Sequence, residues 1–447
     1  MINRFTLRNG VRVVCEHMES VRSVAVGVWA LAGARSEREE YGGTSHFIEH
    51  MLFKGTRRRT AKQIAEEIEY VGGHINAFTA KDCTCFYTRT LDSHLGVAID
   101  ILSDILLHSK FNKADVDLER NVILEEINMY EDSPDELVHD ILAEGVWRGN
   151  PLGGPILGRP ETLAVIDKAV MKGYMAERYV PDNIVISIAG SFSEKDLFQM
   201  LEKSFNKIGK AAKSPAGTAG DAGAAGDAGD AAVSAGSGCE TGCKAGYISD
   251  CFIRQKDTEQ IHLCIGFNGI ELGDDDLYPL HLVNYLFGGG MSSVLFQKIR
   301  EELGLVYSIY SYITAYIGAG ILTVYAGMQE SQAERVYEMI LTELGRFKKS
   351  GVDAELLSRA KEQFKGSFYM GLESPGARMS SLGKTLLTLG YIIAPDETVD
   401  RIEKVSLDDA YRVTEKVFAP ERLAISAVGR IGDGLQNAFK RPGSRCF

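Results

Sequence analysis

The feature that most limits the fold of this chain is one short pattern that occurs near the end of each half. Residues 181–190 read PDNIVISIAG, and residues 420–429 read PERLAISAVG. Each segment has a proline, an acid, an apolar strand with a serine at the same place, and a closing glycine. The same offset lays residues 119–127 on 358–366, and both stretches have a helical pattern. These matches predict an internal duplication.

The two halves are separated by a stretch that is almost entirely Ala, Gly, Asp and Ser. Such a stretch has nothing to bury and is typical of a flexible linker. We therefore expect an N-terminal catalytic domain at 1–210, a linker or insertion at 211–246 and a C-terminal homologous domain at 247–447. Both halves mix apolar strand patterns, at 23–31, 260–267 and 319–326, with amphipathic helix patterns, at 95–107 and 332–348. The predicted fold class is α+β, with a mixed or antiparallel sheet packed with helices in each domain.

Charge and hydropathy exclude several classes of protein. The chain has 49 Lys and Arg against 61 Asp and Glu, a net charge of −12, which disfavours binding to nucleic acid or to an anionic membrane. It has no apolar run long enough to span a bilayer. Residues 2–15 form a strand–turn–strand pattern instead of a signal peptide, so we expect a cytoplasmic protein. Cys239 and Cys243 could pair, bind metal or be incidental thiols.

The strongest local motif is H-x-x-E-H at residues 46–50. On a helix that begins after Thr44 or Ser45 as a cap, His46 and His50 share one face and can bind one metal ion. Glu49 lies on the same side, close enough to accept a proton from an activated water. Apolar neighbours surround the motif, so its polar side chains need a partner. Two solvated histidines on a surface helix are the alternative.

A catalytic zinc site usually needs a third protein ligand. In the helix pattern at 118–127, Glu119 and Glu126 are seven residues apart and share a face with Val122 and Ile123. A carboxylate on an apolar face is costly unless it is paired. Glu126 is therefore the predicted third ligand, and Glu119 is predicted to orient a histidine. Ion pairing on the helix surface remains an alternative.

Residues 46–56 (HFIEHMLFKGT), 72–79 (GGHINAFT) and 119–126 (ERNVILEE) resemble the pitrilysin/insulinase family of zinc peptidases. The similarity is nearest to the beta subunit of mitochondrial processing peptidase and its bacterial homologues. The resemblance implies one Zn2+ per chain, held by His46, His50 and Glu126 and supported by Glu119, with Glu49 as general base. It also implies two domains that close like a clam shell around a chamber.

The resemblance further implies residues that contact the substrate. Asn76, Ala77 and Phe78 lie in a strand pattern that continues to residue 87. In the family this strand is an exposed edge that pairs with the substrate backbone, which is β-augmentation; an ordinary core strand is the alternative. Arg300 and Tyr307 resemble an Arg and a Tyr that reach the reaction centre, where the hydroxyl would stabilise an oxyanion. A helix-end Arg and a strand Tyr are the alternative.

An acidic stretch follows the second glutamate motif, at residues 131–140. In the processing peptidase, carboxylates ten and fourteen residues after the zinc-binding glutamate bind an arginine just before the cleaved bond. Counted from Glu126, these positions are Glu136 and Asp140. Paired carboxylates suit the guanidinium geometry. The resemblance thus implies a preference for basic, presequence-like peptides, and a solvated charge run is the alternative.

The predicted function is that of a zinc metalloendopeptidase acting on peptides or unfolded segments. A non-catalytic structural subunit of the same fold and a peptide-binding module are the alternatives. The expected partners are a peptide substrate and either a second copy of the chain or a related subunit. Neither nucleic acid nor membrane is expected.

Overall fold

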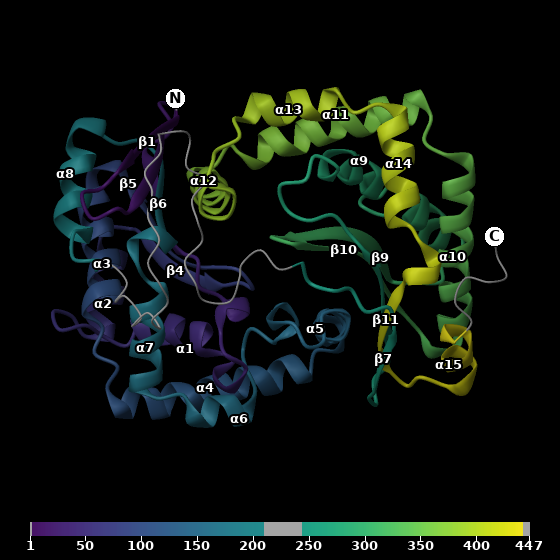
Figure 1. Ribbon diagram of the computed structural model, residues 1–447, viewed down its shortest axis with the longest axis horizontal. Helices are drawn as coiled ribbons and strands as arrows, with labels where there is room; N and C mark the ends of the chain where they lie inside the picture. The colour runs from purple at the N-terminus through teal and green to yellow at the C-terminus, as the bar shows by residue number, and fades with distance from the viewer. Residues whose placement is uncertain (1, 210–243, 441–447) are drawn as a thin grey trace, which may run out of the picture.

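The computed structural model describes residues 2–209 and 244–440. Cys239, Cys243 and most of the predicted linker lie outside the described residues. The chain forms two domains, each built on a β-sheet with helices packed against it (Figure 1). The predicted α+β class is confirmed. Within the described residues, no helix combines the length and the hydropathy that a membrane span requires.

Within residues 2–209, six strands form the sheet of the first half, in the order β1-β2-β6-β3-β5-β4. All neighbours are antiparallel except β2 and β6. The strands are β1 (Ile2–Thr6), β2 (Arg12–His17), β3 (Ser23–Ala30), β4 (His74–Thr79), β5 (Thr84–Leu91) and β6 (Ile184–Gly190). The expected turn between the first two strands is present, with Gly10 at a φ of 102° that favours glycine.

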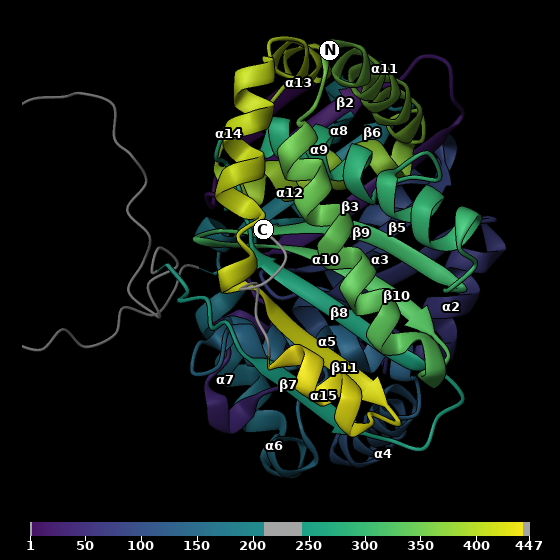
Figure 2. The same cartoon turned by 90° about the vertical axis from the view of Figure 1, so that its right-hand side faces the viewer.

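Within residues 244–440, five strands form the sheet of the second half, in the order β7-β11-β8-β10-β9 (Figure 2). They are β7 (Cys251–Gln255), β8 (Ile261–Asn268), β9 (Ser308–Tyr316), β10 (Ala319–Met328) and β11 (Ala424–Gly429). If β7 to β11 are matched in chain order with β2 to β6, the two sheets have the same strand order. The single parallel pair, β7 with β11, also falls at the matching place. This common topology agrees with the duplicated sequence pattern.

Helices pack on both faces of each sheet. Those of the first half are α1 (Thr44–Leu52), α2 (Ala61–Tyr70), α3 (Leu95–His108), α4 (Lys113–Glu131), α5 (Pro134–Val146), α6 (Pro160–Val165), α7 (Lys168–Arg178) and α8 (Glu194–Phe205). Those of the second half are α9 (Leu277–Phe287), a π-helical stretch at Phe296–Glu302, α10 (Ala333–Ser350), α11 (Ala354–Gly371), α12 (Pro375–Leu389), α13 (Pro395–Glu403), α14 (Leu407–Val417) and α15 (Asp433–Phe439).

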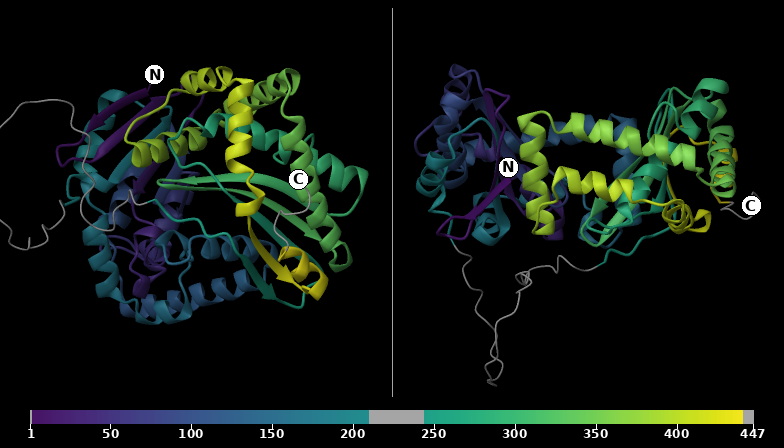
Figure 3. Two further views of the ribbon diagram at one scale, coloured as in Figure 1. Left: turned by 45° about the vertical axis from the view of Figure 1, so that its right-hand side comes forward. Right: turned by 90° about the horizontal axis from the view of Figure 1, so that it is seen from above.

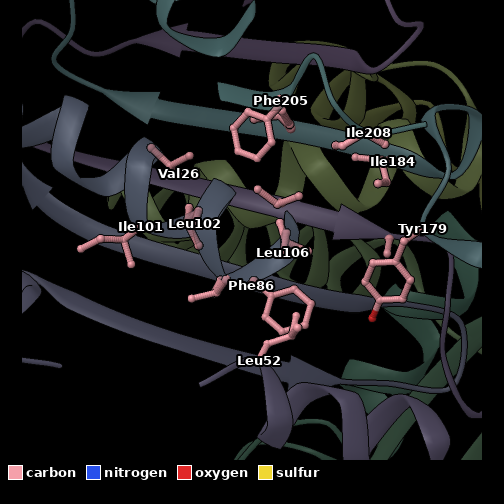
Figure 4. Packing of buried hydrophobic residues seen from close by; sticks show 14 of the residues in the cluster. Val26, Leu52, Phe86, Ile101, Leu102, Leu106, Tyr179, Ile184, Phe205 and Ile208 are labelled. Atoms are coloured by element: carbon pink, nitrogen blue, oxygen red, sulfur yellow. The ribbon is translucent and has the colours of Figure 1, made fainter. Parts of the chain in front are cut away.

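The main core of the first half lies between its sheet and its own helices. Val26 and Phe86 of the central strands meet Leu102 and Leu106 of α3, and Leu52 joins them from α1 (Figure 4). Burying these large apolar side chains supplies the main favourable term in folding. This packing fixes α1 against the sheet, so the helix with the H-x-x-E-H motif stands on a rigid base.

The other face of each sheet is covered by a helix from the opposite half. Met379 and Leu382 of α12 pack on Trp29 of the first sheet. In return, Val138 and Leu142 of α5 pack against the second sheet. Helix α12 reaches the first half at the end of α11 (Figure 3). Because both faces are covered, β3 and β10 are apolar along nearly their whole length instead of alternating.

Candidate metal centre

Helix α1 positions the motif, and its N-terminus is capped differently from the prediction. Thr44 and Ser45 lie inside the helix, and Gly43 is the N-cap, with a φ of 94°. The Glu37 carboxylate accepts hydrogen bonds of 2.6 Å from the backbone N–H groups of Gly43 and Ser45. Burial raises the pKa of Glu37 to about 7, against the lowering effect of these donors. The carboxylate of Glu37 therefore caps the helix, in place of the hydroxyl of Thr44 or Ser45 that we expected.

The two histidines of α1 face helix α4. The imidazole rings of His46 and His50 are 4.6 Å apart between centroids. Glu126 of α4 places its Oε2 atom 3.7 Å from Nε2 of His46 and 3.6 Å from Nε2 of His50. The spacing of residues in the sequence does not predict that α4 contacts α1, but in the fold the two helices meet at these side chains.

These three side chains fit a zinc ion. Tetrahedral zinc with bonds of about 2.0–2.1 Å holds its ligand atoms roughly 3.4 Å apart, close to the spacing found here. The Glu126 Oε2 atom and His46 Nδ1 are buried without a hydrogen-bond partner among the described residues. Burial, followed by the effect of His50, lowers the pKa of His46 to about 3, so the imidazole is neutral as a ligand must be. Across residues 2–209 and 244–440, only His46, His50 and Glu126 form such a cluster.

Glu119, which the sequence predicted to orient a histidine, contacts His50. Its Oε2 atom is 3.0 Å from Nδ1 of His50, and its side chain is almost fully buried. A carboxylate only accepts, so Nδ1 carries the proton and Nε2 keeps its lone pair for a metal. The Lys54 ammonium group lies 2.6 Å from the other oxygen of Glu119. On α4, Glu119 and Ile123 are buried but Val122 is exposed, so the expected common face did not include Val122.

Glu49 lies on the same helix, and its carboxylate is held by Thr79, a residue to which no sequence pattern assigned a role. Its Oε2 atom accepts a hydrogen bond of 2.5 Å from Oγ1 of Thr79, the last residue of β4. Burial raises the pKa of Glu49, while the Thr79 hydrogen bond and His50 lower it and Glu126 raises it further. Thr79 follows Ile75 and Ala77 on the inward side of an alternating strand, and this pattern is the signal that could have found it.

The strand predicted to bind substrate is at the edge of the sheet. Among the residues that the structure describes, β4 pairs only with β5. The strand pattern was wrong in one respect, because the chain reverses at residues 80–83 and residues 84–87 belong to β5. Asn76 is exposed and its Oδ1 accepts from the backbone N–H of Ala77. Phe78 is partly exposed and packs on Trp29.

Two other predicted residues, Arg300 and Tyr307, belong to the second half of the chain. Tyr307 precedes β9 and is 75% exposed, and Arg300 stacks on the ring of Phe296 in the π-helical stretch. Within the described parts of the chain, no hydrogen bond, ion pair or ring contact joins Tyr307 or Arg300 to the first half.

Glu136 and Asp140 are both exposed, one turn apart on α5. Desolvation raises the pKa of Asp140, and so does Glu136, while Lys81 lowers it. Desolvation also raises the pKa of Tyr130, followed by the effects of Glu136, Asp140 and Glu126. The acidic pair and Glu126 therefore both act on the Tyr130 hydroxyl.

Comparison with known proteins agrees with this geometry. The family model described as "Insulinase (Peptidase family M16)" matches residues 12–160, and "Peptidase M16 inactive domain" matches residues 166–364. An uncharacterized zinc protease of Bacillus subtilis, YmxG, is 40% identical over 97% of this chain and 99% of its own length. The chain belongs to peptidase family M16. An uncharacterized zinc protease of Streptomyces coelicolor is 37% identical over 97% of the chain and 90% of its own length.

Two solved structures share the fold of this chain. A protease from Helicobacter pylori superposes with a TM-score of 0.83 at 19% identity and covers 96% of this chain and 99% of its own. A peptidase M16 inactive domain from Pseudomonas fluorescens gives 0.83 at 17% identity, covering 96% and 98%. These comparisons confirm the resemblance to the M16 family and the two-domain fold. They show no special tie to the mitochondrial processing peptidase.

Proposed function

We propose that this M16 protein is a zinc metalloendopeptidase that binds one Zn2+ per chain. The observation that carries the proposal is the meeting of His46, His50 and Glu126, whose ligand atoms lie within 4.8 Å of one another. Two neutral imidazoles and one carboxylate are a common donor set of hydrolytic zinc enzymes. The names of its M16 relatives, which are called zinc proteases, support the same activity.

When bound, zinc supplies Lewis-acid polarisation of a carbonyl and activation of water. Glu49 takes the proton from the attacking water and returns it to the nitrogen of the leaving amine. Glu119 keeps the proton of His50 on Nδ1 and the ring in one orientation. Tyr307 is proposed to donate a hydrogen bond to the oxyanion, and Arg300 to bind the substrate, when a peptide lies between the halves.

The proposed substrate is an extended peptide or an unfolded segment. Residues 76–78 of the edge strand would pair with its backbone and leave its sequence largely free. Glu136 and Asp140 support a preference for arginine near the cleaved bond, because paired carboxylates match a guanidinium group. We further propose a cytoplasmic enzyme that acts alone, as a homodimer or with a related subunit.

The test compares the wild type with Glu49→Gln and with Glu125→Gln. Glu125 is an exposed carboxylate beside Glu126 and serves as the matched control. Zinc per chain is measured, and each protein is incubated with an arginine-containing peptide and an arginine-free counterpart under mass spectrometry. We expect about one zinc in all three proteins, and cleavage by the wild type and Glu125→Gln only.

Each part of the proposal can fail separately. A wild type without zinc or without cleavage of either peptide would contradict the peptidase and favour a structural or peptide-binding protein. Cleavage by Glu49→Gln at the wild-type rate would remove its role as the base. Equal rates on the two peptides would remove the basic preference but leave the peptidase in place.

A further inference from the structure

The general base of the proposed reaction has one protein hydrogen bond among the described residues. Thr79 Oγ1 lies 2.5 Å from Glu49 Oε2, which is short and suits a hydroxyl donating to a carboxylate. The second oxygen, Oε1, receives no hydrogen bond from the described part of the chain. The contact therefore engages one oxygen of the base and leaves the other for a water.

The Thr79 hydroxyl is itself held in place. Thr79 closes β4, where its backbone pairs with Thr84 of β5. The Thr84 hydroxyl is fully buried and donates to the carbonyl oxygen of Ala32, and its oxygen is 3.4 Å from that of Thr79. On the same side of β4, Ile75 and Ala77 pack against the main core. The donor is thus fixed by a strand and a core rather than by a mobile loop.

We propose that Thr79 is a positioning residue that fixes the rotamer of Glu49 for proton transfer. A carboxylate on a two-carbon arm has several rotamers, and a base must present one lone pair to the water along one direction. A hydrogen bond from a rigid strand selects one rotamer before the substrate arrives. The inference rests on the proposed peptidase function and assigns a role beyond the metal ligands and the base.

The position of Thr79 also links the base to peptide binding. The three residues before it form the edge at which an extended substrate is proposed to pair. A peptide paired along β4 would lie on the strand whose last side chain already holds Glu49. The same strand would then bind the peptide and align the base. Helix α1, which carries Glu49, packs against β4 in the core.

The test measures kcat and KM for a peptide that the wild type cleaves, together with zinc affinity. Thr79→Val removes the hydroxyl and keeps the shape, while Thr79→Ser keeps the hydroxyl. Thr88→Val is the matched control, because Thr88 is a buried threonine of the neighbouring strand whose hydroxyl has no partner among the described residues. A hydrogen bond to a charged group suggests a fall in kcat of about 10- to 100-fold for Thr79→Val.

The expected pattern separates positioning from a structural effect. Thr79→Val should change KM and zinc affinity by less than about twofold, and both Thr79→Ser and Thr88→Val should keep a kcat close to the wild type. If Thr79→Val fails to fold, Thr79→Ala and Thr79→Ser form a second pair that differs by one hydroxyl oxygen. Equal kcat values within the pair used would overturn the inference.

Failure of the inference is distinct from failure of the proposed function. If the wild type cleaves peptide, Glu49→Gln does not, and Thr79→Val keeps the wild-type kcat, only the role of Thr79 is wrong. If Glu49→Gln cleaves as well as the wild type, the base itself is wrong, and the Thr79 inference falls with it.

Discussion

At the residue scale, the ion pair between Lys54 and Glu119 supports the contact that holds His50, a proposed zinc ligand. Glu119 is only 2% exposed, so its charge depends on the two groups that meet it. Lys54 lies 2.6 Å from Oε1, and His50 Nδ1 lies 3.0 Å from Oε2. Without Lys54, the carboxylate would lose its only cationic partner among the described residues and become free to turn away from His50.

We therefore predict that Lys54→Met weakens zinc binding by about 10-fold or more, in line with losses at other groups that orient metal ligands. Lys54→Arg should keep most of the affinity, because it keeps the charge. Competition with a chelator of known affinity measures the effect. Lys62→Met is the control, since Lys62 pairs with Glu66 on an exposed helix face. An unchanged affinity in Lys54→Met would show that Glu119 needs no cation.

How well each residue of the candidate metal centre could be predicted depends on how far away in the sequence its partners lie. His46, Glu49 and His50 were predictable from helix spacing. Glu126 and Glu119 required a second pattern and the family resemblance, because no rule of spacing says that α4 meets α1. Lys54 lies within the segment 46–56 that resembles the family, but no sequence pattern was a reason to assign it a role. Its partner is 65 residues away, and only tertiary structure brings the two together.

At the scale of elements, the fit of α12 on the first sheet depends on one glycine. A Cβ atom at Gly383 would come within 2.1 Å of Trp29 Nε1 and 2.6 Å of Ser187 Oγ. Those two atoms also form a hydrogen bond of 2.8 Å. Neither partner can move without disturbing the central strands, so the helix itself must give way.

We predict that Gly383→Ala lowers the free energy of unfolding by about 1–3 kcal/mol, the usual cost of overpacking. Gly376→Ala in the same helix is the control, because nothing lies within 4 Å of a Cβ there. That variant should be neutral or slightly more stable, given the helix propensity of alanine. Urea unfolding followed by tryptophan fluorescence compares them. A stable Gly383→Ala would mean that α12 packs on the sheet less closely than described.

The strands and helices themselves were largely predictable, whereas their partners were not. The patterns at 23–31, 95–107 and 319–326 match β3, α3 and β10 closely. The cap of α1 was missed because its carboxylate comes from Glu37, outside the local pattern. The reversal after β4 was missed because residues 80–83 have no glycine or proline to mark a turn.

At the scale of the whole molecule, each half completes the core of the other. Trp29 of the first sheet contacts α12, and Cys264 of the second sheet contacts α5. The repeated serine of the sequence pattern serves this exchange on both sides. Ser187 binds Trp29 beside α12, and Ser426 donates to the Val138 carbonyl of α5. The duplication could be predicted from the sequence, but this exchange of helices could not, because it joins segments more than a hundred residues apart.

A cluster of polar side chains lies inside one of these exchanged contacts. Nδ1 of His139 on α5 and the Tyr312 hydroxyl are hydrogen-bonded at 2.7 Å. The same atom is 3.3 Å from Cys264 Sγ, and the ring stacks on Tyr325. Burial is the main cause that lowers the pKa of His139 to about 4; Asp135 acts against this lowering and His262 adds to it. The contact between the halves therefore requires a neutral imidazole.

This requirement makes the packing of α5 sensitive to acid. An unfolded histidine has a pKa of about 6.5, so between pH 6.5 and 4 the unfolded chain binds a proton that the folded chain excludes. The contribution of neutral His139 to the free energy of unfolding is complete above pH 6.5. It is lost as the pH falls from 6.5 to 4. The contribution of His139 between pH 7 and pH 5 is about 2 kcal/mol.

We predict that His139→Gln, which keeps an acceptor for Tyr312, loses stability less steeply than the wild type between pH 7 and pH 5. The midpoint of the first urea transition, measured at both values, gives the difference. His74→Gln, at an exposed histidine, should follow the wild type. Some pH dependence should remain in His139→Gln, because burial also lowers the pKa of His262. If His139→Gln and the wild type were equally acid-labile, protonation of His139 would not be what loosens α5 from the second sheet, and the acid sensitivity of the two-half assembly would have to come from another group.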